Sequence, residues 1–121
     1  MVGSVRILLI EDDVLNADFF LAVLEHDGHT VTHEASGIVG QARAQAKPFD
    51  LVLCDIDLPG QTGIAVCRAL REAGFRGKIV ALSAHIERDV RAGGHQPGFD
   101  GWLEKPIAPP ALRAAVRAYQ P

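Results

Sequence analysis

Residues 50–64 read DLVLCDIDLPGQTGI, and this segment is the most informative one about the fold. Its apolar run, Leu51–Cys54, is continuous rather than alternating, which is typical of a parallel strand covered by helices on both faces. The run ends at Asp55, and Pro59–Gly60 then favours a turn. Thr62 can cap a helix whose apolar positions recur at helical spacing. The stretch therefore predicts a strand, a polar loop and a helix of an α/β protein.

The same unit recurs on both sides of this stretch. Four further strands are predicted, and they span Val5–Ile10, Thr30–Glu34, Lys78–Leu82 and Gly101–Leu103. Helical patterns fill the intervals: Asp13 can cap the first, Gly28 can end it, and Pro109–Pro110 can open the last. Strand and helix thus alternate five times. This predicts a doubly wound, five-stranded parallel sheet, because a closed barrel needs about twice the chain.

Composition narrows the classes of function. The 121 residues, 48% hydrophobic and 22% charged, suit a single domain over residues 1–121, in which residues 1–4 are expected to be flexible or non-native. The net charge of −3 gives no basic surface, so we expect no direct binding of nucleic acid. No apolar run approaches the roughly 18 residues of a membrane span, and no secretory signal is visible, so we expect a cytoplasmic protein without membrane contact.

Polar side chains follow the strands at the edge where such sheets bind ligands. The acidic residues 11–13 follow the first strand, Asp55 the third and Ser83 the fourth, while Lys105 precedes Pro106 after the fifth. Clustered carboxylates repel one another, and Mg²⁺, which prefers oxygen ligands, relieves that repulsion. A carboxylate can accept a phosphoryl group when a metal and a lysine neutralise the transferring oxygens. Taken singly, each residue also suits a cap, a turn or the surface, so the hypothesis depends on their shared edge.

Four segments, LLIEDDVLN, DLVLCDIDLPGQTGI, ALSAH and GWLEKPI, together resemble the response-regulator receiver domains of two-component signalling. The resemblance spans nearly the whole chain and implies the flavodoxin-like strand order 2-1-3-4-5. It implies that Asp55 accepts a phosphoryl group from a phosphohistidine of a sensor histidine kinase or a histidine phosphotransfer protein. Asp12 and Asp13 would then hold Mg²⁺ together with the Asp55 carboxylate and the backbone carbonyl of Asp57.

The resemblance also implies roles for the other residues of this edge. Ser83 would bond one phosphoryl oxygen and Lys105 another, with a cis peptide bond between Lys105 and Pro106. Asp57 and His85 would flank the phosphoryl group and tune its lifetime, although His85 also suits an ordinary loop histidine. Trp102 stands where the family usually has a switch Tyr or Phe, so we expect either restricted rotation or a fixed hydrophobic plate.

One segment departs from the family pattern. Residues 92–98 read AGGHQPG, and in a helix interior Gly costs about 1 kcal/mol and Pro about 3 kcal/mol. We therefore predict a short fourth helix near Ile86–Ala92, followed by an irregular, mobile segment. Because this region usually carries the output, the downstream partner stays open. A monomer or a weak, phosphorylation-dependent dimer is expected.

Two other functions stay open at this point. Asp55, Ile56 and Asp57 match the D-x-D pair of haloacid-dehalogenase-type phosphatases, although that family usually places the pair after its first strand and has a longer chain. A phosphorylation-independent interaction module of the same fold would be marked by loss of Asp55 or Lys105, and both are present. The expected protein is thus a phosphoacceptor switch that catalyses only its own phosphorylation and dephosphorylation, either alone or as part of a longer regulator or hybrid kinase.

Overall fold

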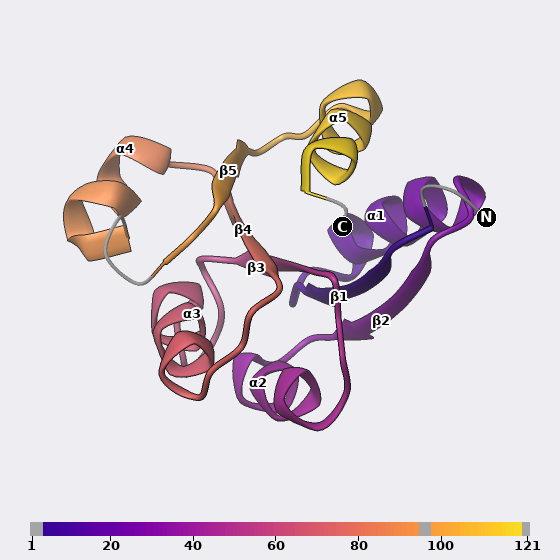
Figure 1. Cartoon of the computed structure of the whole chain (residues 1–121). Coiled ribbons are helices and arrows are strands. Elements are labelled where there is room, and N and C mark those ends of the chain that lie inside the picture. Colours follow the sequence, from indigo (N-terminus) through magenta and orange to yellow (C-terminus); the bar gives the residue numbers. More distant parts are fainter. Residues whose placement is uncertain (1–3, 95–97, 120–121) are drawn as a thin grey trace.

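Five parallel strands form one sheet in the order β2-β1-β3-β4-β5, with helices on both faces (Figure 1). The computed structural model describes residues 4–94 and 98–119. The strands are β1 (Arg6–Ile10), β2 (Thr30–Glu34), β3 (Leu51–Asp55), β4 (Lys78–Ser83) and β5 (Gly101–Glu104). The helices are α1 (Val14–His26), α2 (Gly37–Ala46), α3 (Gly63–Glu72), α4 (Ile86–Asp89) and α5 (Pro109–Tyr119). This confirms the predicted doubly wound sheet and its strand order.

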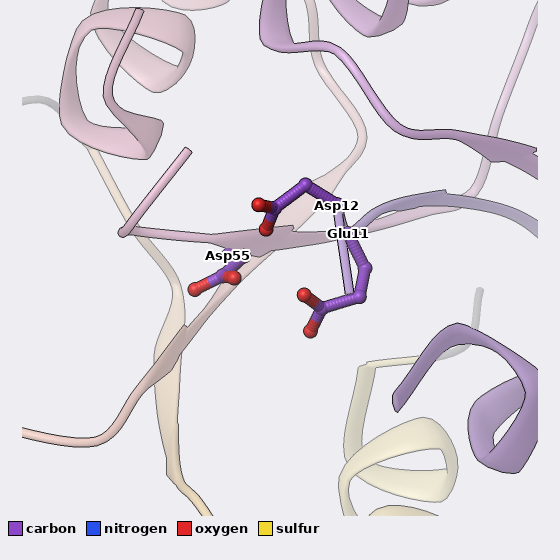
Figure 2. A group of neighbouring side chains, drawn as sticks. All are labelled: Glu11, Asp12 and Asp55. Atoms are coloured by element: carbon purple, nitrogen blue, oxygen red, sulfur yellow. The ribbon is translucent and has the colours of Figure 1, made fainter. Parts of the chain in front are cut away.

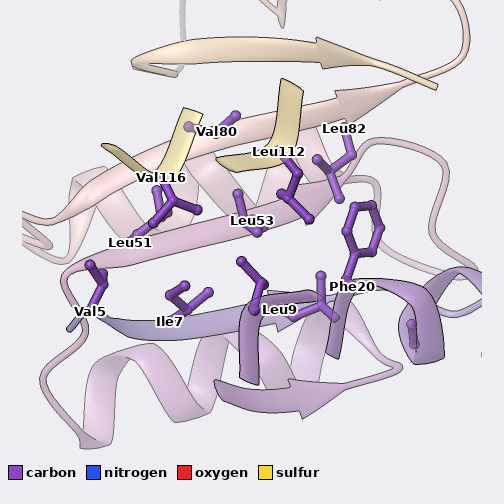
Figure 3. Close-up of a cluster of buried hydrophobic side chains, with 12 residues drawn as sticks. Val5, Ile7, Leu9, Phe20, Leu51, Leu53, Val80, Leu82, Leu112 and Val116 are labelled. Atoms are coloured by element: carbon purple, nitrogen blue, oxygen red, sulfur yellow. The ribbon is translucent and has the colours of Figure 1, made fainter. Parts of the chain in front are cut away.

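Two hydrophobic clusters fill the space on either side of the sheet. The first lies between the sheet and helices α1 and α5 and contains Ile7, Leu9, Leu53 and Leu112 (Figure 3). The second lies under α2 and α3 and contains Leu8, Ile10, Val52, Cys54, Val66, Cys67 and Leu70. Successive residues of β1 and β3 therefore enter opposite clusters, which explains why their sequences are apolar without interruption. Both cysteines are buried, as expected of core thiols.

Helix ends follow the predicted capping residues. The Asp13 carboxylate accepts a hydrogen bond from the Asn16 amide at 3.0 Å, and the Thr62 hydroxyl accepts one from the Ala65 amide at 3.2 Å. Gly28 follows α1 with a φ of 89°, a left-handed conformation that a side chain disfavours. The Asp13 and Thr62 caps therefore fix where two loops at the carboxyl edge of the sheet end, and Gly28 lies in the loop from α1 to β2 at the opposite edge.

The fourth helix is short, as predicted. Helix α4 continues into a π-helical turn at Val90–Gly94, within which Gly93 has a φ of 98°. Gly tolerates this left-handed conformation, and regular helix cannot continue through it. The predicted irregular segment includes residues 95–97, which lie outside the described residues, as do residues 1–3 at the start of the chain. In the described part of the chain, no helix combines the length and apolarity needed to cross a bilayer.

Arg71 of α3 fixes the segments that lead into β4 and β5. Its guanidinium donates to the carbonyl oxygens of Phe75 and Gly77 at 2.9 Å each, and to that of Gly98 at 3.0 and 3.1 Å. It also donates to the Asp100 carboxylate at 2.8 Å. One half-buried side chain thus connects α3 to the segment that leads into β5.

Candidate phosphoacceptor site

Three carboxylates meet where β1 and β3 end. One carboxylate oxygen from each of Glu11, Asp12 and Asp55 lies within 4.8 Å of the other two (Figure 2). Glu11 and Asp12 directly follow β1, and Asp55 is the last residue of the neighbouring strand β3. Glu11 and Asp55 are buried, whereas Asp12 is exposed. A set of oxygen ligands with one open side suits Mg²⁺, which takes one or two carboxylates and keeps several waters.

Asp13 lies outside this cluster, unlike the expectation from the sequence. From the sequence we expected Asp12 and Asp13 to hold the metal together, but in the structure the carboxylate next to Asp12 in the cluster is that of Glu11. The Asp13 carboxylate instead caps α1 through the Asn16 amide, so it is directed at the first helical turn. A signal for this was available: because α1 needs Asp13 as its cap, only the two preceding acids remain for a metal.

Lys105 connects two of the carboxylates. Its Nζ atom lies 2.7 Å from Glu11 Oε1 and 3.0 Å from Asp55 Oδ2. The Lys105 amide donates to the Ser83 carbonyl at 2.8 Å, and the peptide bond between Lys105 and Pro106 is cis, as expected. The loop after β5 therefore places an ammonium beside the carboxylates of the two central strands.

Burial dominates the ionisation of Asp55. It raises the pKa of Asp55 from 3.8 to about 7; the hydrogen bond with Glu11 also raises this pKa, and the Lys105 ammonium lowers it. For Lys105, burial lowers the pKa, but the hydrogen bonds to Glu11 and Asp55 outweigh burial and leave it raised. A cation at these carboxylates would favour the ionised form of Asp55, which is the nucleophilic form.

Ser83 at the end of β4 is engaged by α4. Its buried hydroxyl donates to Asp89 Oδ2 at 2.5 Å and accepts a hydrogen bond from the His85 amide at 2.9 Å. Arg88 Nη2 lies 3.1 Å from the other oxygen of Asp89 and 3.4 Å from Asp57 Oδ1. The sequence reasoning missed Asp89, because an acid on a short helix resembles any surface residue.

The remaining predicted residues lie around this site. The Asp57 amide donates to Asp55 Oδ1 at 3.1 Å, while the Asp57 side chain is exposed. The His85 side chain is exposed beyond Ser83. Trp102 is half-buried on β5, with its ring edge-on to Phe99 and 5.1 Å between the ring centroids. Their roles in phosphoryl lifetime and switching stay predictions.

A groove adjoins the site on the α1 side. Its volume is about 420 Å³, and it is lined by Asn16, Phe19, Phe20, Ala84, Lys105, Pro106 and Ile107. Leu15 of α1 is 80% exposed. The surface next to Lys105 therefore combines apolar side chains with one ammonium.

Known proteins resemble this chain over nearly its full length. Response regulator protein PmrA of Pseudomonas aeruginosa is 36% identical over 113 residues, which are 93% of this chain and 51% of PmrA. Sensor histidine kinase AruS of the same species is 32% identical over 119 residues, which are 95% of this chain and 12% of AruS. The chain thus spans about half the length of the curated response regulators that it matches.

A solved structure supports the same relationship. The receiver domain of sensor histidine kinase PA1611 from Pseudomonas aeruginosa PAO1, which has a magnesium ion coordinated in its active site cleft, is 30% identical with a TM-score of 0.90. The alignment covers 96% of this chain and 97% of that domain. The family model described as response regulator receiver domain matches residues 7–117. The fold, the carboxylates at the ends of β1 and β3 and these matches all agree. The chain belongs to the response regulator receiver domain family.

Proposed function

We propose that this domain accepts a phosphoryl group on Asp55 from a phosphohistidine of a histidine kinase or histidine phosphotransfer protein. One observation carries the proposal: Asp55 lies beside two further carboxylates and in contact with an ammonium. Its oxygens are close to those of Glu11 and Asp12, and Asp55 Oδ2 lies 3.0 Å from Lys105 Nζ. With a cation held by the carboxylates, such a site would neutralise the oxygens of a transferring phosphoryl group from two sides, the cation on one and the Lys105 ammonium on the other.

The phosphoryl group moves to Asp55 in a single displacement at phosphorus. A carboxylate oxygen of Asp55 forms a bond to phosphorus while the P–N bond of the phosphohistidine breaks, and the imidazole leaves with the electron pair of that bond. The Lys105 ammonium compensates charge on the phosphoryl oxygens, and the Ser83 hydroxyl, at the end of the adjacent strand, would donate to one of them once it has left Asp89. The domain is thus a phosphoacceptor switch, and it acts only on its own phosphorylation and dephosphorylation.

Mg²⁺ fits the donor set at this edge. Glu11, Asp12 and Asp55 would contribute carboxylate oxygens, and the backbone carbonyl of Asp57 is a further proposed ligand. Asp13 is left out of the set because its carboxylate caps α1. When bound, Mg²⁺ supplies charge neutralisation at the acceptor carboxylate and the incoming phosphoryl group.

The groove next to Lys105 is the proposed docking surface for the phosphodonor. It opens beside the acceptor, and its apolar lining includes Phe19, Pro106 and Ile107. A partner helix with an apolar face could pack there while it presents its phosphohistidine to Asp55. We propose that Ser83 and Trp102 pass the phosphorylation state on to downstream partners. The domain is proposed to be cytoplasmic, and to be a monomer or a weak dimer that forms on phosphorylation.

The two alternative functions are less well supported. A phosphatase of the haloacid-dehalogenase type would place its D-x-D pair after the first strand, whereas Asp55 ends the third strand along the chain. A phosphorylation-independent module would not need an intact acceptor site, yet Asp55 and Lys105 are both present and in contact.

Intact-mass measurement tests the proposal. With acetyl phosphate and Mg²⁺, the wild type should gain one phosphoryl group, and Asp55→Asn should gain none. Asp18→Asn, which makes the same change at an exposed position of α1, should behave as the wild type. Labelling that stops at one equivalent, without turnover of p-nitrophenyl phosphate, separates a receiver from a phosphatase. A folded wild-type protein that neither binds Mg²⁺ nor gains mass would refute the proposed function.

A further inference from the structure

Asp89 is a buried carboxylate that the proposed phosphoryl chemistry does not use. Its exposed fraction is 4%, and that of Ser83, to which it is hydrogen-bonded, is 0%. A buried carboxylate is destabilising unless hydrogen bonds or counter-charges compensate it. Here the Ser83 hydroxyl contacts Oδ2, while Arg88 contacts Oδ1. Both oxygens are therefore engaged, and the hydroxyl of Ser83 is one of the groups that stabilise the charge.

The hydrogen bonds of Ser83 leave no proton for a second acceptor. A serine hydroxyl carries one proton and accepts through its lone pairs. Ser83 accepts from the His85 amide at 2.9 Å and donates its proton to Asp89. To donate to a phosphoryl oxygen on Asp55, the hydroxyl must first leave Asp89. The two bonds exclude one another.

We infer that Asp89 is a positioning residue that holds the Ser83 hydroxyl in the unphosphorylated state and so opposes formation of the phosphorylated arrangement. The inference rests on the proposed phosphoacceptor function of Asp55. Charge-assisted hydrogen bonds are roughly twice as strong as neutral ones, so the competition with a phosphoryl oxygen is substantial. Asp89 thus sets part of the equilibrium between the two states without contacting the phosphoryl group.

Arg88 extends this contact toward the acceptor. Its Nη2 atom lies between Asp89 Oδ1, at 3.1 Å, and Asp57 Oδ1, at 3.4 Å. Asp57 in turn donates its amide to Asp55. A chain of polar contacts therefore runs from the acceptor loop through α4 to Ser83. Release of Ser83 from Asp89 removes one of the hydrogen bonds between α4 and the end of β4, so the state of the acceptor is transmitted to α4.

Binding of beryllofluoride, which mimics a phosphoryl group on Asp55, tests this inference in the Mg²⁺-loaded protein. Fluorescence of Trp102, the sole tryptophan, reports binding. Asp89→Ala should bind about tenfold more tightly than the wild type, because the competing acceptor is gone. Asp89→Asn should show a smaller gain, since a neutral amide oxygen accepts more weakly. Glu87→Ala is the matched control: it removes an exposed acid from the same helix and should leave the affinity unchanged.

A double-mutant cycle separates positioning from a general effect on structure. In the Ser83→Ala background, Asp89→Ala should no longer alter beryllofluoride affinity, because no hydroxyl remains to compete for. The inference is overturned if Asp89→Ala raises the affinity equally in both backgrounds, or if it does not raise the affinity in the protein that keeps Ser83. If Asp89→Ala does not fold, the same cycle with Asp89→Asn decides. Absence of a Mg²⁺-dependent response in the wild type would instead refute the proposed function and this inference together.

Discussion

Replacing Asp55 with Asn removes a carboxyl group whose ionisation the metal-free fold opposes. Burial, and then the hydrogen bond with Glu11, raise the pKa of Asp55 from 3.8 to about 7 against the opposing effect of Lys105. A raised folded-state pKa contributes stability that is complete below the unfolded value and is lost as the pH rises through the folded value. The free energy of unfolding of the wild type should therefore fall between pH 3.8 and about 7, relative to that of Asp55→Asn.

The magnitude follows from the two pKa values. A difference of one in pKa equals about 1.4 kcal/mol, so the whole interval corresponds to about 4 kcal/mol. For a single titrating group, about 3 kcal/mol of this change lies between pH 5 and pH 8. Mg²⁺ should reverse the loss at pH 8 in the wild type but not in the variant, because a ligand that binds only the folded state stabilises it.

Urea denaturation followed by circular dichroism, in EDTA at pH 5 and pH 8, measures this difference. Groups that do not contact residue 55 titrate alike in both proteins and cancel in the comparison. Asp18→Asn, at an exposed position, should keep the pH dependence of the wild type. The reasoning fails if Asp55→Asn and the wild type lose the same free energy of unfolding between the two pH values.

Two further predictions concern the loops that support the site. Arg71→Ala should lower the free energy of unfolding by about 2–4 kcal/mol, because it removes the donor to the partly buried carbonyls of Phe75 and Gly77 and the ion-pair partner of Asp100. In urea denaturation, Arg68→Ala at an exposed position should be nearly neutral, and equal effects of the two variants would contradict this role of Arg71. Gly63→Ala should lower the free energy of unfolding by about 1–3 kcal/mol and slow phosphorylation by acetyl phosphate, because a Cβ atom would lie 2.2 Å from the Asp55 carbonyl oxygen. If urea denaturation and the phosphorylation rate are both unchanged, the loop can move aside and this prediction is wrong.

Much of the fold was predictable because burial on both faces makes the central strands apolar throughout. The edge strand β2 matched its predicted range, Thr30–Glu34, although it is only half-buried. Asp55 and Lys105 could be placed at one edge because the carboxyl ends of parallel strands meet there. Placement at the edge needs only that the strands are parallel and that each residue follows its strand, and both can be inferred from the alternation of strands and helices along the sequence.

The acidic cluster was harder to predict because three acids follow β1 in succession. Consecutive side chains point in different directions, and the backbone at a helix start directs one of them to the first-turn amides. Asp13 takes that position, which leaves Glu11 with Asp12. The contact between Asp89 and Ser83 depends on how α4 packs against β4, which composition and periodicity do not report.

Helix α4 is attached to the domain differently from the other helices. Among the described residues, none of 86–94 belongs to either hydrophobic cluster, and Arg88 and Asp89 are held by ion pairs and a hydrogen bond. Apolar burial supplies most of the folding free energy, so this segment can change in sequence or length with little loss to the core. Over evolutionary time, the surface around α4 can therefore diverge to suit new partners while the acceptor chemistry at the sheet edge stays the same.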